Sequence, residues 1–546
     1  MPPAAIQRIL KDTFGFSRLR EGQEEVIRAV LAQRNTLAIM PTGAGKSLCY
    51  QLPALHLPGV TVVVSPLISL IKDQADKLAE LEVCAVQVNS SLSADEERSA
   101  LEAISNGKAE FVFTTPERLA NAEFAALLKA QKIDLLVVDE AHCISQWGHD
   151  FRPAYLELRE AIRELQVPSV LALTATARPD VIEDIRSGLG LADLHVIDFG
   201  LYRPNLKFEV RHVTNEDEKR THVLALLEQI EGSGAIYTAT VKQAEALADF
   251  LHGAGHPVEK YHGKLAARQR KAAQDRFMSG EARVMVATNA FGMGIDKPDI
   301  RFVIHYQMPG SIEAYYQEAG RAGRDNQPAH CVLLYDLNDK RTQQFFLGGR
   351  YPGSADFRRV YSAIKQCADG SQTATLQVLT ERLRPLAKAK IQVVLAALRE
   401  LGIVKRIRGS GYRVAQDVAL TTLETQAVAY LNKADSDRHK LEQMLYYGQS
   451  VACRWRQILE YFGETPDFEQ CGRCDVCLNP PRAPIETATA APSVPQPAPL
   501  AVGDRIRTPQ HGSVRVESVE NEIIVARLKN GELKRFHRDY IVPLAP

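Results

Sequence analysis

Long apolar segments are missing from this sequence of 546 residues. No run approaches the roughly 20 apolar residues that a helix needs to cross a bilayer. The N-terminal stretch, MPPAAIQRILKDTF, also lacks the apolar core of a signal peptide. We therefore expect a cytoplasmic protein that neither spans a membrane nor is secreted.

A surplus of charge of either sign is also missing, because Lys plus Arg and Asp plus Glu both number 66. Without a global basic field, any contact with a polyanion must come from local patches. The content of 45% hydrophobic and 24% charged residues is ordinary for a globular protein. The length exceeds what one core supports and predicts roughly three or four domains.

Cysteine is sparse, with nine residues in the whole chain. Five are scattered, and scattered cysteines in a cytosolic protein are usually small buried hydrophobes. The other four gather near the C-terminus and are Cys453, Cys471, Cys474 and Cys477. Four thiolates match a closed, tetrahedral structural Zn²⁺ site. An iron–sulfur cluster is the alternative that uses the same ligands.

A glycine-rich loop follows a short apolar run at residues 37–40. Its sequence, PTGAGKS, resembles the end of the form G-x-x-x-x-G-K-[ST] and lacks the first glycine of that form. In such a loop backbone N–H groups wrap phosphates, Lys46 can reach the β and γ phosphates, and the Ser47 hydroxyl can bind Mg²⁺. The predicted nucleotide-binding residues of this loop are Thr42, Gly43, Gly45, Lys46 and Ser47.

A pair of carboxylates, Asp139 and Glu140, follows the apolar, β-branched run IDLLVV at residues 133–138. Such a run predicts a fully buried strand, and open α/β sheets bind ligands at the carboxyl ends of their strands. One carboxylate there can hold Mg²⁺ while its neighbour orients an attacking water. An acidic pair by itself more often caps a helix or faces solvent. A catalytic role is therefore predicted for this pair only together with the phosphate loop.

Short apolar strands alternate with helical segments along the first two thirds of the chain. This pattern predicts an α/β fold with parallel sheets covered on both faces, and a second set of such units begins near Ala235. In that second set, the segment YQEAGRAGRD places Gln317, Arg321 and Arg324 at spacings that share one helical face. They form either a solvated basic face or the cationic group that a phosphate loop needs in its transition state.

Taken together, these motifs resemble the RecQ family of superfamily 2 DNA helicases over residues 6–337. The most specific segments are FGFSRLREGQ, MPTGAGKSLCYQLPA, DEAHCISQWGHDFRPAY, ALTATA, ATNAFGMGID and YYQEAGRAGRD. The aromatic-rich loop SQWGHDFRP separates this family from other ATPases. The resemblance implies an ATP- and Mg²⁺-dependent enzyme of the bacterial cytoplasm or nucleoid that moves 3′ to 5′ on single-stranded DNA and unwinds forked duplexes in repair or recombination.

The resemblance also implies roles for individual residues. Phe16 and Arg20 would sandwich adenine, and Gln23 would bond its edge. The catalytic set would be Lys46, Asp139, Glu140, Gln317, Arg321 and Arg324, with Arg324 as the arginine finger. Ser47 and Asp139 would hold Mg²⁺. Trp147, His149, Phe151 and Arg152 would contact single-stranded DNA, because bases stack on aromatic faces regardless of sequence.

The order of the C-terminal parts departs from the family pattern, in which a zinc module directly follows the second lobe. The predicted domains are RecA-like lobes at 1–205 and 206–345, a winged helix at 346–416, a helical hairpin with the four-cysteine zinc module at 417–479, a Pro/Ala-rich linker at 480–500 and an SH3/Tudor-like barrel at 501–546. In the winged helix, Arg406 and Arg408 could contact a duplex, or they could belong to a solvated basic hairpin.

The barrel is similar to the C-terminal module of UvrD-type helicases and CarD-type proteins, which suggests RNA polymerase or another protein as a partner. Its basic residues also permit a nucleic-acid partner, and an accessory fold without a partner is a further alternative. Two further alternatives stay open at this point. The chain could be an RNA helicase, or a DNA-stimulated ATPase or translocase that acts as a protein-recruiting adaptor.

Overall fold

The computed structural model describes residues 4–145, 152–292, 297–369, 373–407 and 411–480, and within the C-terminal segment 502–508, 512–520, 523–528, 533–537 and 542–543. The chain divides into two compact units, residues 1–480 and 481–546, which we describe separately. Within the described ranges, none of the helices combines the length and the apolar character that crossing a membrane requires.

Lobe 1 is a parallel seven-stranded sheet in the order β3-β4-β2-β5-β6-β1-β7. Its strands are β1 (Thr36–Ile39), β2 (Val60–Val64), β3 (Ala85–Val88), β4 (Phe111–Thr114), β5 (Ile133–Val138), β6 (Val170–Thr174) and β7 (His195–Asp198). Its helices are α1 (Ala4–Asp12), α2 (Gln23–Leu31), α3 (Leu48–Ala54), α4 (Ile68–Glu80), α5 (Ala94–Ser105), α6 (Pro116–Leu119), α7 (Ala122–Lys129), α8 (Leu158–Leu165) and α9 (Pro179–Leu189), with short 3-10 turns η1 (Ala141–Ile144) and η2 (Pro153–Glu157).

The sheet of lobe 1 is buried on both faces, as its unbroken apolar strands predict. Side chains alternate along a strand, so Leu37 and Ile39 enter one hydrophobic core while Ala38 enters another on the opposite face. The central strands β1, β2, β5 and β6 are buried throughout. Their carboxyl ends therefore form a rigid edge on which loops can carry functional side chains.

Lobe 2 repeats this design with six parallel strands in the order β10-β11-β9-β12-β13-β8. The strands are β8 (Leu206–His212), β9 (Ser233–Tyr237), β10 (Val258–Tyr261), β11 (Val284–Ala287), β12 (Ile300–His305) and β13 (Ala329–Tyr335), and the helices are α10 (Glu216–Gln229), α11 (Val241–Gly253), α12 (Ala267–Ser279) and α13 (Ile312–Ala319). A Cβ on Gly234 would lie 2.2 Å from the Phe302 ring, so β9 and β12 require a glycine at this contact.

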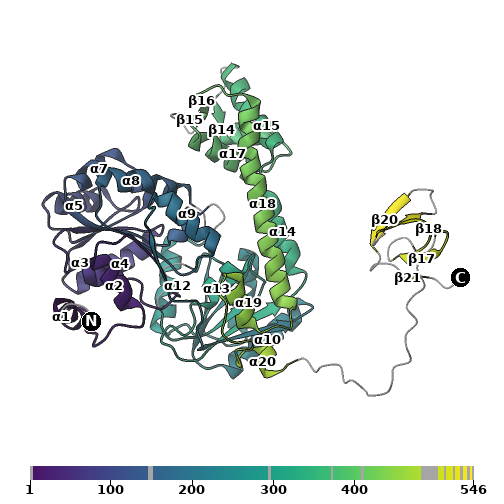
Figure 1. Ribbon diagram of the computed structural model, residues 1–546, viewed down its shortest axis with the longest axis horizontal. Coiled ribbons are helices and arrows are strands. Elements are labelled where there is room, and N and C mark those ends of the chain that lie inside the picture. The colour runs from purple at the N-terminus through teal and green to yellow at the C-terminus, as the bar shows by residue number, and fades with distance from the viewer. Residues whose placement is uncertain are drawn as a thin grey trace. The chain divides into compact units, whose positions relative to one another are not determined.

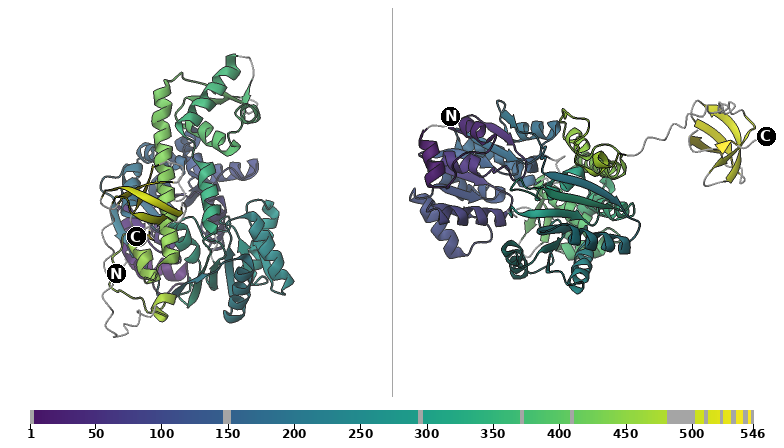
Figure 2. Two further views of the ribbon diagram at one scale, coloured as in Figure 1. Left: turned by 90° about the vertical axis from the view of Figure 1, so that its right-hand side faces the viewer. Right: turned by 90° about the horizontal axis from the view of Figure 1, so that it is seen from below.

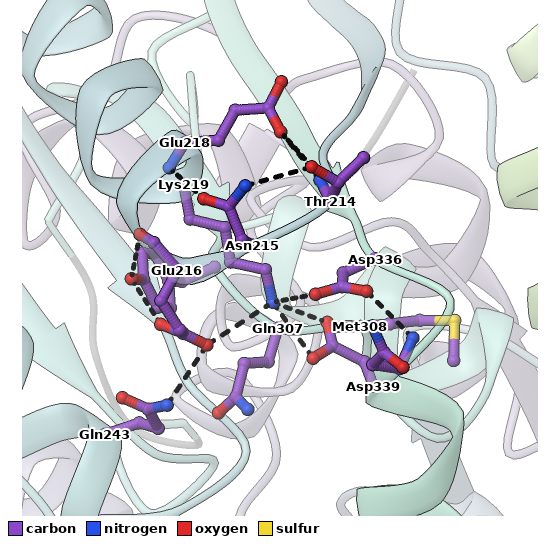
Figure 3. Close-up of polar contacts among 12 residues, drawn as sticks. Thr214, Asn215, Glu216, Glu218, Lys219, Gln243, Gln307, Met308, Asp336 and Asp339 are labelled. Carbon is purple, nitrogen blue, oxygen red and sulfur yellow. Dashed lines mark hydrogen bonds and ion pairs between the residues drawn. The ribbon is translucent and has the colours of Figure 1, made fainter.

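A buried ion network fixes the exit of the chain from lobe 2 (Figure 3). The Lys219 ammonium, which is fully buried, lies 3.0 Å from Asp339 Oδ1 and 3.6 Å from Asp336 Oδ2. The second oxygen of Asp339 accepts a hydrogen bond of 3.0 Å from the Met308 N–H. Opposite charges and hydrogen bonds together offset the cost of burying these groups. The network thereby ties the start of α14 to α10 and to the loop after β12.

The segment after lobe 2 is folded as an insertion between two packed helices, α14 and α18 (Figures 1 and 2). Its elements are α14 (Asp339–Arg350), α15 (Ser354–Asp369), β14 (Ala374–Thr375), α16 (Leu376–Arg382), α17 (Lys388–Glu400), β15 (Val404–Ile407), β16 (Gly411–Val414) and α18 (Leu420–Gln449). Helices α15, α16 and α17 and the antiparallel sheet β14-β16-β15 enclose a separate core that includes Phe357, Leu379 and Leu398. We call residues 354–415 the inserted module.

This arrangement differs from the prediction in two respects. The expected boundary at residue 345 falls inside α14, which continues to Arg350. The expected helical hairpin within 417–479 begins with a helix of 30 residues, α18, which packs against α14, a helix that precedes the inserted module. Helical periodicity alone shows that a helix forms, but it does not show which distant helix covers its apolar face.

The cysteine-rich segment packs directly on lobe 2 through α19 (Arg454–Tyr461) and α20 (Asp475–Leu478). The buried Trp455 donates from Nε1 to Leu206 O over 3.0 Å, and Asp475 Oδ2 accepts a bond of 3.0 Å from Val210 N. Arg454 in turn pairs with Asp475 at 3.0 Å. Because these bonds engage strand β8 itself, the segment shares one hydrophobic core with lobe 2.

The second unit contains a five-stranded antiparallel sheet in the order β20-β19-β18-β17-β21. Its strands are β17 (Arg505–Thr508), β18 (Gly512–Glu520), β19 (Ile523–Arg527), β20 (Leu533–His537) and β21 (Val542–Pro543). Ile506, Val514 and Ile524 are among the buried residues of its small core. The short alternating strands expected in this region are therefore present.

Candidate functional site

The phosphate loop connects β1 to α3 at the carboxyl edge of the lobe 1 sheet. Gly43 and Gly45 adopt φ angles of +89° and +82°, a region that side chains disfavour. A Cβ at Gly45 would also lie 2.5 Å from Gln23 Nε2 and would displace that side chain. Lys46 Nζ donates to Met40 O over 3.1 Å, which bends the lysine back over the loop. The loop thus has the strained, compact form of a phosphate cradle.

Asp139 lies at the end of β5, beside this loop. Its backbone N–H donates to Val64 O at 2.9 Å, and its Oδ1 accepts from Glu140 N at 3.0 Å. Burial, together with the neighbouring Glu140 charge, raises the pKa of Asp139 to about 7, and Lys46 opposes that rise. A buried carboxylate with a raised pKa needs a nearby cation to stay ionised at neutral pH.

Glu140 has a backbone φ of +49°, which is uncommon for a residue with a side chain. Its buried Oε2 accepts no hydrogen bond from the described part of the chain, and His142 Nδ1 lies 3.4 Å away. Asp139, Glu140 and the nearby Ser47 hydroxyl supply only oxygen ligands, which are the ligands that Mg²⁺ prefers. The residues therefore fit a magnesium ion.

His142 connects the carboxylate pair to β6. The Thr174 hydroxyl donates to Thr176 O at 3.0 Å, so it accepts from His142 Nδ1 over a further 3.0 Å. This assigns the proton of the imidazole to Nδ1. Neither His142 nor Thr174 was among the predicted site residues. The signal was present, because His142 follows β5 and Thr174 is the last residue of β6, and these two buried strands prove to be neighbours.

The arginine loop, which we define as residues 320–324, follows α13 in lobe 2 and contacts the phosphate loop of lobe 1. A Cβ on Gly43 would lie 3.1 Å from Cγ and 3.2 Å from Cβ of Arg324, and a Cβ on Gly320 would lie 3.5 Å from Cβ of Thr42. Glycines at both positions allow the two loops to touch. Arg324 therefore lies directly beside the phosphate loop.

These residues line one cavity of about 690 Å³ between the two lobes. The predicted nucleotide-site residues that line it are Phe16, Arg20, Gln23, Thr42, Gly43, Gly45, Lys46, Ser47, Asp139, Glu140, Gln317, Arg321 and Arg324. The structure thus brings together two sets of residues that are far apart in the sequence. The chemical role of each residue stays a prediction.

At the end of the cavity that is predicted to bind adenine, Phe16 is 53% exposed, which leaves its ring accessible for stacking. Arg20 donates to Gly43 O. Gln23, which is buried, donates from Nε2 to Ala44 O at 3.2 Å and to Gly45 O at 3.0 Å. Arg20 and Gln23 therefore support the phosphate loop as well as line the cavity.

The predicted DNA contacts are described only in part. Trp147, His149, Phe151 and Arg408 lie outside the described residues. Arg152 is described, and its Nη1 donates to Pro66 O over 2.8 Å, which ties the end of the aromatic-rich loop to the loop after β2. Arg406 is exposed on β15 of the inserted module.

The four clustered cysteines bring their sulfur atoms together. The Sγ atoms of Cys453, Cys471, Cys474 and Cys477 all lie within 4.8 Å of one another. A tetrahedral Zn²⁺ with Zn–S bonds of about 2.3 Å separates its sulfurs by roughly 3.8 Å, so the cluster is close to the required size. Backbone N–H groups of Cys471 and Arg454 donate to the sulfurs of Cys453 and Cys474 and would stabilise thiolates. The four cysteines therefore fit a tetrahedral zinc ion.

Three family profiles match segments of this chain. The profile of the DEAD/DEAH box helicases matches residues 20–185, that of the helicase conserved C-terminal domain matches 218–326, and that of the RecQ zinc-binding domain matches 418–478. The ATP-dependent DNA helicase RecQ of Synechocystis is 34% identical over 491 residues, which cover 87% of this chain and 98% of the relative.

Other relatives match over a smaller share of their length. The RecQ helicase of Bacillus subtilis is 46% identical over 62% of this chain, and that of Haemophilus influenzae is 34% identical over 88%. The matches span 58% and 64% of those two proteins.

Solved structures show the same fold. The helicase Lhr of Mycobacterium smegmatis, bound to single-stranded DNA and AMP-PNP, has a TM-score of 0.51 at 20% identity over 78% of this chain and 62% of its own. The DNA-bound helicase MrfA has a TM-score of 0.52 at 17% identity over 77% and 64%. On the extent of the Synechocystis match and on the zinc-binding segment, this chain belongs to the RecQ family of ATP-dependent DNA helicases.

Proposed function

We propose that this protein hydrolyses ATP to move 3′ to 5′ along single-stranded DNA and unwinds duplexes in repair or recombination. The observation that carries this proposal is the contact between the arginine loop of lobe 2 and the phosphate loop of lobe 1, with Asp139 and Glu140 in the same cavity. A cavity shared by two lobes changes shape when they move. ATP bound there can therefore drive closure of the lobes, and ATP hydrolysis can let the lobes open again.

In this proposal each residue of the cavity has one task. Lys46 and the backbone of residues 42–47 bind the phosphates, while Phe16, Arg20 and Gln23 hold adenine. Glu140 orients the attacking water, and Arg324 stabilises the charge that develops on the transferred phosphoryl group. Gln317 and Arg321 complete the cationic face. Mg²⁺ held by Ser47 and Asp139 would neutralise phosphate charge.

An unwinding assay tests the proposal. The protein should separate a 3′-tailed or forked duplex in the presence of ATP and Mg²⁺, and should leave a 5′-tailed duplex paired. Lys46→Ala should abolish both ATP hydrolysis and unwinding, because the phosphates lose their only lysine contact from the loop. Unwinding by the Lys46→Ala protein, or a preference for the 5′ tail or for RNA, would contradict the assignment.

We also propose that DNA is held in two places. The aromatic-rich loop, through Trp147, His149, Phe151 and Arg152, would grip single-stranded DNA next to the carboxylate pair. The inserted module would act as a winged helix that binds duplex DNA, although it precedes the zinc module. In support, residues 354–415 contain twelve lysines and arginines and four acidic residues, within a chain of zero formal net charge.

Replacing Arg406 with alanine should weaken duplex binding equally for all sequences, because an exposed arginine on β15 would contact phosphate rather than bases. The slope of log K against log salt is negative, and loss of one phosphate contact reduces its magnitude by about 0.9. Fluorescence anisotropy between about 50 and 200 mM salt measures that slope. Lys260→Ala, on the far strand β10 of lobe 2, is the control and should change nothing. Equal slopes for wild type and Arg406→Ala would show that Arg406 makes no contact with a DNA phosphate.

The C-terminal unit supports a second proposal, in which a small SH3/Tudor-like domain recruits a protein partner such as RNA polymerase. The observation that favours it is a sheet with its own core after the Pro/Ala-rich stretch 480–500. In the unwinding assay, a chain that ends at residue 480 should remain active and should lose capture of that polymerase. Loss of unwinding on this deletion would instead make the unit part of the motor.

A further inference from the structure

The segment that joins the two lobes, residues 199–205, carries a buried arginine. Arg203 is only 6% exposed and lies between β7 of lobe 1 and β8 of lobe 2. Its guanidinium donates to Gly320 O at 2.7 Å, to Ala322 O at 2.8 Å and to Gly323 O at 2.6 Å. All three carbonyls belong to the arginine loop.

Burying this charge is costly, and no carboxylate within the described ranges lies close enough to Arg203 to form an ion pair. Burial lowers the pKa of Arg203, in line with the absence of a direct ionic partner. The planar guanidinium carries donors in a fixed fork, so it can satisfy several carbonyls only if they hold one particular arrangement. Arg203 therefore selects a single conformation of the arginine loop.

That conformation determines where the loop aims its side chains. Along the loop, the carbonyls of residues 320, 322 and 323 point to Arg203, while Arg321 and Arg324 line the nucleotide cavity. Fixing the peptide planes on one side of each arginine fixes the direction of its Cα–Cβ bond on the other side. A change in the loop backbone would thus move the tip of Arg324 by more than the backbone itself moves.

Asn205 completes the same contact. Its Nδ2 donates to Gly323 O at 2.8 Å and to Gln327 O at 3.0 Å. Gly323 has a φ of +57°, and a Cβ there would lie 2.4 Å from this nitrogen. Gly323 is therefore needed both for the turn and for the approach of Asn205.

The joining segment is itself held by other parts of the unit. Leu201 N donates to Glu464 Oε1 of the cysteine-rich segment over 2.7 Å, and Leu201 O accepts from Tyr316 Oη of α13 over 2.6 Å. The joining segment, which carries Arg203, is consequently held by a hydrogen bond to α13, the helix that leads into the arginine loop. Any change in the joining segment as the lobes move is passed directly to the loop that faces the phosphates.

We propose that Arg203, assisted by Asn205, is a positioning residue that sets the orientation of Arg324 toward the nucleotide. This rests on the proposed function of Arg324 in ATP hydrolysis. Arg203 does not touch the nucleotide cavity and acts only through the backbone of the arginine loop. Replacing it should therefore reduce turnover without reducing nucleotide affinity.

Arg203→Lys tests this role, because lysine keeps the charge and loses the fork. A misplacement of about 1 Å can cost about 100-fold in rate, so kcat for DNA-stimulated ATP hydrolysis should fall between about 10- and 100-fold. The Kd of a fluorescent, non-hydrolysable ATP analogue should stay within about twofold, since Arg203 makes no contact in the cavity. Asn205→Ala, a milder change, should lower kcat in the same direction by about three- to tenfold.

The chain offers a matched control in Arg283. This arginine of lobe 2 also donates to three backbone carbonyls, with Gly232 O at 2.9 Å, Leu227 O at 2.7 Å and Ile230 O as the third. None of them belongs to the arginine loop. Arg283→Lys should lower Tm by about as much as Arg203→Lys does, and it should leave kcat unchanged. An equal loss of kcat in both lysine variants would show a general effect on folding and would overturn the proposal.

A double variant separates this inference from the proposed function. If Arg203 acts through Arg324, adding Arg203→Lys to Arg324→Ala should change single-turnover hydrolysis by less than about threefold. A full additional loss in the double variant would overturn the positioning role alone. If Arg324→Ala by itself leaves kcat unchanged, the finger assignment and the inference fail together.

Discussion

Replacing Arg324 with alanine is expected to lower kcat for DNA-stimulated ATP hydrolysis by about 10³- to 10⁵-fold. The Arg324 side chain begins within van der Waals reach of Gly43 in the phosphate loop, so its guanidinium can lie beside the terminal phosphate. In the transition state negative charge shifts over the phosphoryl oxygens, and a fixed cation in a water-poor cavity stabilises that charge strongly. Steady-state ATP hydrolysis with saturating single-stranded DNA measures the effect.

The same substitution should leave nucleotide binding nearly intact, because Lys46 and the phosphate-loop backbone remain. Arg276→Ala is a suitable control, since Arg276 pairs with Glu259 at 2.6 Å on lobe 2 and does not line the cavity. Its kcat should equal that of the wild type. A wild-type kcat for Arg324→Ala would mean that another cation stabilises the transition state.

Replacing Cys474 with serine is expected to remove zinc and destabilise the whole of lobe 2. Cys474 is fully buried, and a serine hydroxyl is a poor substitute for a thiolate at a tetrahedral zinc site. Structural zinc contributes about 10 to 16 kcal/mol in small zinc domains, which exceeds the stability of a typical domain. Because the cysteine-rich segment shares its core with lobe 2, the loss should also lower Tm and soluble yield.

Elemental analysis of the purified protein measures this effect. Wild type should contain one zinc per chain, and Cys474→Ser should contain substantially less. Cys84→Ser, at a partly exposed cysteine outside the cluster, should keep its zinc. Equal zinc in wild type and Cys474→Ser would exclude the cluster as the metal site, and iron in place of zinc would favour the iron–sulfur alternative.

Local sequence patterns sufficed for much of the nucleotide site. The phosphate loop follows β1, and Asp139 and Glu140 follow β5, because short apolar runs that alternate with helical segments are typical of the inner strands of a covered sheet. The glycines are predictable for a similar reason, because few other residues fit positive φ angles and close backbone contacts. Residues whose position depends only on the local strand or loop that carries them were thus predictable from the sequence.

Contacts between distant segments were not predictable in this way. The predicted helical hairpin within 417–479 gave no sign that α14, which precedes the inserted module, packs against α18. Likewise, the link from His142 to Thr174 depends on the order of strands in the sheet, which the alternation of strands and helices leaves open.

The sequence by itself determined the chemistry of this protein: a phosphate loop, a carboxylate pair, an arginine segment and four cysteines, each recognisable from residue types at short spacing. Only the tertiary structure decided how these parts are coupled. Arg203 reads as an ordinary polar residue in the chain and becomes the support of the arginine loop more than a hundred residues away. The physical reason is that hydrogen bonds and packing act through space, whereas sequence patterns record only the neighbours along the chain.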